Sequence, residues 1–190
     1  MKKFLKIFLV SVSCFVFALL IGGYFYFNQF VSFQTFMNEN NIQEMDRMIQ
    51  KQGYNVHQTR LGHNHLRLYL AANYPQSNPN VIQKLIDLGY NINFLQNQND
   101  ISDLMFAVVL GDLSAVKILI QNGADVNYIH QKSRFSVLDT AIRSGKFEIA
   151  NYLIENTSAK LSAATTEIDI NEIRHDVGLG KLSPIILEKF

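Results

Sequence analysis

The stretch LGDLSAVKILIQNGADVN, residues Leu110–Asn127, contains a helix between two glycine turns. Gly111 ends a short apolar helix, and Gly123 ends the next helix before an extended turn. Between these glycines, apolar residues follow the three- and four-residue spacing of one helix face: Leu113, Val116, Leu119 and Ile120. The stretch therefore predicts a turn, an amphipathic helix and a second turn.

The same pattern recurs 34 residues further along the chain, where Gly145 takes the place of Gly111. The helix-face residues correspond in the same order: Phe147 to Leu113, Ala150 to Val116, and Leu153-Ile154 to Leu119-Ile120. A fixed period of this length is typical of helix–turn–helix arrays, in which each unit buries its apolar face against its neighbours.

Residues Gly123–Asn127 have the sequence Gly-Ala-Asp-Val-Asn. With the apolar helix and the glycine turn before them, they resemble the ankyrin repeat. The resemblance covers about residues 33–160. It implies a solenoid that binds a protein partner, catalyses no reaction and needs no cofactor. We therefore expect an all-α, ankyrin-type helix-turn-helix solenoid preceded by one N-terminal transmembrane helix.

About four units are expected, and the first two depart most from the family pattern. The first has a helix over residues 31–41 and an apolar stripe of Ile42, Met45, Met48 and Ile49. The second starts near Leu66, where Leu66–Ala72 resembles the family's Thr-Pro-Leu-His-Leu-Ala-Ala segment. This alignment places Ala71 and Ala72 where neighbouring helices approach closely.

The third unit, residues 102–127, and the fourth, residues 136–158, match best. Ser102 and Ser136 are predicted N-caps. The predicted organisation is a cytoplasmic start and anchor over residues 1–28, repeats over 29–160, and a helical cap over 161–190. A cap is expected because a terminal unit has one face against water.

Residues Ile7–Phe27 form a run of 21 residues without a charge. A helix of this length spans about 31 Å, close to the hydrocarbon thickness of a bilayer. A cleaved signal peptide would have a shorter apolar region and a small-residue cleavage site, but Tyr24–Phe27 follows here. A lipoprotein signal at Cys14 would need an aliphatic residue where Ser11 stands. We therefore predict an uncleaved single-pass anchor that contacts the lipid bilayer through residues 7–27.

The charges that flank this run predict its orientation. Lys2, Lys3 and Lys6 precede it, whereas residues 28–46 contain no Lys or Arg. The positive-inside rule then places the N-terminus in the cytoplasm and the repeats outside it. The lysine-rich start and Asn/Gln-rich body resemble bacterial membrane-anchored ankyrin proteins, so the expected compartment is the periplasm of a bacterial envelope.

Composition argues against a nucleic-acid partner. Three of the 17 Lys and Arg residues precede the apolar run, so 14 remain against 16 acidic residues, a balance of −2. A nucleic-acid-binding face needs clustered Lys and Arg side chains. The single cysteine, Cys14, excludes an intramolecular disulfide.

Catalytic and metal-binding patterns are weak. His57, His63 and His65 lie in a turn region without cysteine or carboxylate at ligand spacing, so no metal site is predicted. Asp139 stands at the histidine position of the family's Thr-Pro-Leu-His segment, where we expect a local hydrogen-bonding role. A periplasmic enzyme that uses His63 or Asp139 is the alternative from another functional class.

A partner-binding surface is predicted where the array exposes apolar and basic residues together. Val109 and Leu110 end a helix at positions expected to face water, and the turn after the third unit adds further apolar and basic side chains. The predicted contact residues are Val109, Leu110, Tyr128, Ile129, Lys132, Arg134, Phe135 and Arg143. An apolar centre with a basic rim is typical of protein interfaces. The alternative is that Leu110 and Ile129 pack against their own turns.

The sequence therefore favours a non-enzymatic protein-binding module displayed in the envelope. It would be a scaffold or stabiliser of a resident protein or, alternatively, an immunity protein that neutralises a delivered effector.

Overall fold

The computed structural model describes residues 33, 35–39, 41–52, 55–56, 64–95, 97, 100–165 and 167–189. The predicted anchor, residues 7–27, lies outside this set, as do Cys14, His57 and His63. No helix among the residues so described is both long enough and apolar enough to cross a bilayer.

The described part of the chain is built from helices and turns, with an isolated β-bridge between Ile129 and Ser136. Phe33 and residues 35–38 are helical. The named helices follow in the order α2 (Ile42–Gln52), α3 (His65–Asn73), α4 (Pro79–Asp87), α5 (Asp103–Leu110), α6 (Leu113–Gln121), α7 (Val137–Arg143), α8 (Phe147–Asn156), α9 (Glu167–Gly178) and the 3₁₀ helix η1 (Pro184–Lys189).

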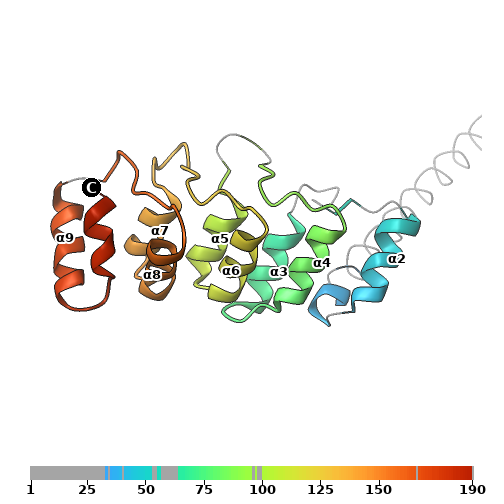
Figure 1. The fold of residues 1–190 in the computed structure, drawn as a ribbon. Coiled ribbons are helices and arrows are strands. Elements are labelled where there is room, and N and C mark those ends of the chain that lie inside the picture. The colour runs from blue at the N-terminus through green and yellow to red at the C-terminus, as the bar shows by residue number, and fades with distance from the viewer. Residues whose placement is uncertain are drawn as a thin grey trace, which may run out of the picture.

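The helices pair into hairpins that stack side by side in one elongated row (Figure 1). Helix α5 contacts both α3 and α7, while α6 contacts both α4 and α8. The first helices of the hairpins therefore form one layer and the second helices another. A single apolar core runs through the whole stack, from Phe33 to Ile186. This arrangement confirms the predicted helix–turn–helix solenoid.

The two glycines that revealed the period occupy matching bends. Gly111, between α5 and α6, has φ +84°, and Gly145, between α7 and α8, has φ +66°. Both values lie in the left-handed region, which glycine adopts without steric cost. The predicted caps are also present, since Ser102 accepts a hydrogen bond from the N–H of Met105 and Ser136 from that of Asp139.

The predicted register of the second hairpin is wrong by two residues. The N-cap of α3 is Asn64, whose side chain accepts from the N–H of Arg67 at 3.1 Å. Tyr69 is therefore buried at the position that Ala107 and Ala141 hold in the next two hairpins, and Ala71 and Ala72 are exposed. Asparagine is a strong N-cap, and Leu66, Leu68 and Leu70 alternate, so the helix fits two registers in sequence but only one with its cap satisfied.

Helix α9 and η1 cover the C-terminal end of the stack (Figure 1). Ile173 of α9 and Ile186 of η1 are buried in the common core. Where Gly123 closes the third unit, the fourth has Thr157, whose hydroxyl donates to the carbonyl of Leu153 at 2.6 Å. A side-chain hydrogen bond thus replaces the glycine turn at the end of α8.

His65, at the start of α3, is fully buried, and its ring meets the edge of Phe33 with a centroid distance of 4.9 Å. Burial lowers the pKa of this imidazole to about 4 from an ordinary value of 6.5. The folded chain therefore binds fewer protons here than the unfolded chain between these two values. The stabilisation is complete above pH 6.5 and is lost as the pH falls towards 4.

We expect His65→Leu to remove up to about 3 kcal/mol of the decrease in the free energy of unfolding between pH 6.5 and pH 4. Urea titrations at several pH values measure this slope. His175→Leu makes the same substitution at an exposed position on α9 and is the control. Equal slopes for wild type and His65→Leu would show that His65 is not buried in its neutral form.

Candidate functional site

The residues predicted to bind a partner do not form one patch. Val109 lies at the C-terminal end of α5, beside the bend at Gly111, whereas Tyr128–Phe135 belongs to the loop between α6 and α7. In Figure 1 this loop lies on the upper edge of the stack, together with the loops before α5 and after α8, and the bends lie on the lower edge. We call the upper edge, formed by residues 91–95, 97, 100–101, 125–136 and 157–165, the tip edge.

Four of the predicted residues have their side chains engaged within the chain. Leu110, which was expected to face water, is half-buried and packs on the core. The Tyr128 hydroxyl donates to the carbonyl of Asp100. Arg143 pairs with Asp169 of α9 at 2.6 Å, and its guanidinium lies 4.2 Å from the ring centre of Phe135. Val109 and Ile129, in contrast, are 46% and 44% exposed.

Ile129 and Arg134 line a groove of about 200 Å³ with three small residues of the next loop, Ser162, Ala163 and Ala164. We call this the tip groove. Sequence reasoning found Ile129 and Arg134 but missed the opposite wall, because that wall lies beyond the last recognisable repeat. The only sequence signal for it is the run of small residues Ser-Ala-Ala-Thr at 162–165.

Backbone hydrogen bonds fix the shape of this loop. The N–H of His130 donates to the carbonyl of Phe135 at 3.0 Å, and the N–H of Arg134 donates to the carbonyl of His130 at 2.8 Å. Arg134 closes the turn with φ +64°, a left-handed conformation that is uncommon for residues other than glycine. Its side chain and that of Lys132 are exposed.

Asparagine side chains hold successive loops of the tip edge together. Asn93 accepts from the N–H of Asp125 at 3.0 Å and donates to the carbonyl of Gly123 at 3.0 Å. One repeat later, Asn127 accepts from the N–H of Lys160 at 3.1 Å. The same side chain thus performs the same task 34 residues apart, and the loops form a connected ladder rather than independent turns.

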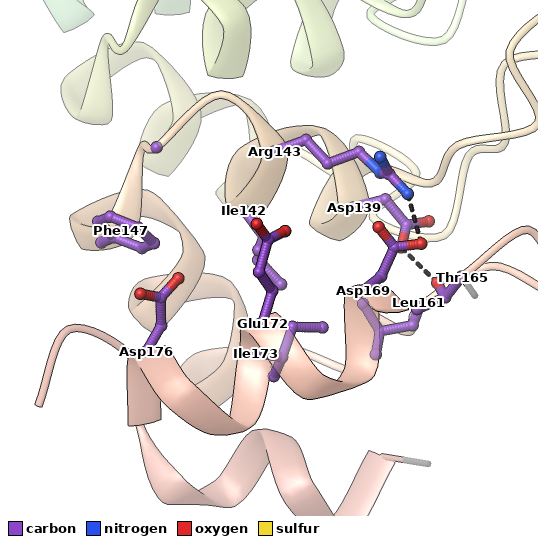
Figure 2. Close-up of a pocket in the computed structure, with 11 residues that line it drawn as sticks. Asp139, Ile142, Arg143, Phe147, Leu161, Thr165, Asp169, Glu172, Ile173 and Asp176 are labelled. Atoms are coloured by element: carbon purple, nitrogen blue, oxygen red, sulfur yellow. Dashed lines mark hydrogen bonds and ion pairs between the residues drawn. The ribbon is translucent and has the colours of Figure 1, made fainter. Parts of the chain in front are cut away.

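A second groove, of about 250 Å³, lies between the fourth hairpin and α9 (Figure 2). Apolar Ile142, Phe147 and Ile173 line it together with four carboxylates and Arg143. Ion pairs occupy both ends, because Arg143 meets Asp169 at one end, and Asp176 near Phe147 at the other end is paired with Lys181 at 3.0 Å. This groove is a joint between the repeats and the cap, and we call it the cap joint.

Asp139 is the central acceptor of the cap joint. One carboxylate oxygen accepts from the N–H and the hydroxyl of Ser136, both at 2.8 Å, and from the N–H of Ser162 at 2.9 Å. The other accepts from the hydroxyl of Thr165 at 2.7 Å. Burial acts to raise the pKa of Asp139, but these donors outweigh it and hold the pKa below its ordinary value.

The arrangement does not support acid–base chemistry by Asp139, because four donors within the chain already occupy its oxygens. No group of three or more His, Cys, Asp or Glu side chains that could hold a metal ion occurs in the described part of the chain. His63, the other residue of the enzyme alternative, lies outside that part.

A family model described as ankyrin repeats in three copies matches residues 68–164, about half of the chain. The chain belongs to the ankyrin-repeat family. Ankyrin repeats are protein–protein interaction modules. Among curated proteins, "Dynein axonemal heavy chain 12" of Bos taurus is 33% identical over 86 residues, which cover 41% of this chain and 23% of that protein. The chain thus spans about a quarter of the length of this relative.

In this ankyrin chain, Asp139 stands where the family has a histidine, and it links the last repeat to the cap. The predicted local hydrogen-bonding role of Asp139 is confirmed, and the structure adds its partners Ser162 and Thr165. Its stabilising effect is present above pH 3.8, the ordinary pKa, and is lost as the pH falls below that value.

We expect Asp139→Asn to weaken the attachment of the cap by about 1–3 kcal/mol, because the amide presents a donor to groups that themselves donate. Amide hydrogen exchange should accelerate over residues 161–178 and remain unchanged in α5 and α6. Glu172→Gln, in the same groove, makes the same chemical change at an exposed side chain and is the control. Unchanged exchange in the Asp139 variant would refute its linking role.

Proposed function

We propose that this chain is a non-catalytic display module, anchored in a membrane by residues 7–27, that binds a protein partner through the tip edge of its third and fourth repeats. The observation that carries this proposal is the tip groove. It is held rigid by hydrogen bonds on both sides, and it combines an exposed apolar side chain, Ile129, with an exposed cation, Arg134. A second exposed cation, Lys132, lies in the same loop.

Rigidity supports binding as the purpose of this edge. A flexible loop must lose conformational freedom when it binds, at a cost of about 0.5–1.5 kcal/mol for each immobilised side chain. Asn93 and Asn127 already restrain the backbone of neighbouring loops through their ladder contacts. A partner would therefore meet a surface that is ordered before contact, and more of the contact free energy would appear as affinity.

The membrane anchor and the envelope location are supported by the sequence of the N-terminal region. A charge-free run of 21 residues is preceded by three lysines and is followed by no Lys or Arg until Arg47. In this topology the repeats stand outside the cytoplasm. The partner would be a resident envelope protein that the module scaffolds or stabilises.

A photo-crosslinking amino acid in place of Lys132 tests partner binding in membranes of the source cell. We expect one discrete crosslinked product, which Ile129→Asp should reduce and Val109→Asp, at an exposed apolar residue on the opposite edge, should leave unchanged. The same photo-reactive residue in place of Glu148, which is exposed on α8, is the control and should give no such product. Leu110 is left unchanged, because it packs on the core and a substitution there would disturb the fold. Crosslinks from Glu148 alone, or from neither site, would refute the tip edge as the binding surface.

Topology is tested by fusing alkaline phosphatase, which is active only outside the cytoplasm, to the C-terminus of the full chain. We expect activity in cells, and we expect it to fall strongly when Lys2, Lys3 and Lys6 are changed to Glu, because the charge difference that orients the helix is then reversed. An active green fluorescent fusion together with an inactive phosphatase fusion would place the repeats in the cytoplasm and refute the orientation.

A further inference from the structure

The tip groove is lined by three apolar side chains, one serine, Ser162, and one cation, Arg134. Ile129, which is 44% exposed, lines it with Ala163 and Ala164. Because alanine side chains are short, they leave space that the rest of the fold does not fill. An apolar side chain that entered the groove would be removed from water, which is favourable in proportion to the apolar area buried.

The loops around the groove carry an excess of positive charge. Across residues 125–136 and 157–165 the exposed charged side chains are Lys132, Arg134 and Lys160 against Asp125. Among the described residues none of these three cations forms an ion pair. Arg143 begins close by on α7, but its charge is offset by Asp169.

Arg134 holds its place at a conformational cost. Its φ of +64° is a conformation in which glycine or asparagine would be less strained. The strain is maintained by the two backbone hydrogen bonds between His130 and Phe135 and between Arg134 and His130. Strained backbone that places an exposed, unpaired cation at the mouth of an apolar groove points to a use for that cation.

The opposite sign of charge lies at the other groove of the fourth repeat. The cap joint is lined by Asp139, Asp169, Glu172 and Asp176 against Arg143. Most of these carboxylates are engaged by donors of the chain itself, and the joint already holds α9 in place. A partner that docks on the tip edge therefore meets cations, and a basic segment would be repelled there.

We infer that the tip groove binds an acidic segment of a protein partner, with one apolar side chain of that segment seated between Ile129 and Ala163-Ala164 and adjacent carboxylates facing Arg134 and Lys132. The inference rests on the proposed function and specifies the chemistry of the partner at that same site. Charge complementarity selects the acidic segment, and the apolar walls select the side chain that anchors it.

A selection from short random peptides displayed on phage, carried out on the full chain in detergent micelles, tests this inference. We expect enriched peptides to combine a Leu, Ile, Phe or Met with two or more neighbouring Asp or Glu residues. Fluorescence anisotropy of one enriched peptide then measures its Kd. A selection that enriches no acidic peptides, or enriches basic ones, overturns the inference.

Variants locate the contact. Arg134→Glu should raise the Kd of the peptide about tenfold or more. Arg134→Lys, which keeps the charge, should retain most of the affinity. Arg174→Glu on α9 makes the same charge change at another exposed arginine and is the matched control. Binding by Arg134→Glu within about twofold of wild type would overturn the assignment.

Filling the groove tests the apolar half of the inference. Ala163→Phe should abolish binding, and if this variant fails to fold by circular dichroism, Ile129→Ala, which removes an exposed wall, should weaken binding instead. Unchanged affinity in the folded variant overturns the claim that an apolar side chain binds in the groove. Crosslinking from Lys132 to a cell partner that persists in Arg134→Glu would leave the proposed function standing while this inference fails.

Discussion

Register between neighbouring hairpins is the constraint on which the rest of this structure depends. Apolar burial drives the stacking, but it is non-directional and would tolerate sliding. A buried polar joint supplies direction between the second and third repeats. Asp103, fully buried at the start of α5, accepts from the Nε of Arg67 at 2.7 Å and from the side chain of Asn64 at 3.1 Å, and also from the hydroxyl of Tyr90. Burial raises the pKa of Asp103, and the guanidinium of Arg67 opposes that rise.

A buried ion pair of this kind contributes little net stability, because the free energy of desolvation offsets the attraction. Its effect on alternatives is larger, since leaving one charge buried without its partner costs about 3–5 kcal/mol. A slipped hairpin would do this to Arg67 or Asp103. Neutral amide side chains also set register, with a smaller desolvation cost than an ion pair. Gln83 of α4 and Asn122 beyond α6 exchange hydrogen bonds at 2.9 and 3.3 Å. The Asn/Gln-rich composition therefore has a structural use in setting register.

The extent to which the structure could be predicted from the sequence differs along the chain, for physical reasons. The bends at Gly111 and Gly145 and the caps at Ser102 and Ser136 were predictable, because each depends on a local conformational preference of one residue. The register of α3 was not, because alternate leucines fit two alignments and Asn64 decides between them. Of the candidate site, the exposure of Val109 and Ile129 followed from helix and turn positions. The pairing of Arg143 with Asp169 did not, because it joins segments from different units and no local pattern encodes it.

The ends of the array explain why its charges are distributed as they are. Ankyrin repeats present the same faces in every unit, so a terminal repeat needs something to cover the side that has no neighbour. Helix α9 does this with carboxylates that meet Arg143 and Lys181, and the pairing with Asp169 offsets the charge of Arg143. The cations of the loop between α6 and α7 lie on another edge, where the cap has no carboxylate bound to them. The cap thus pairs the cations at the end of the stack, whereas the cations beside the tip groove keep no carboxylate partner from the cap. An edge of fixed shape with uncompensated charge and an exposed isoleucine is better suited to an acidic, partly apolar partner than to water alone.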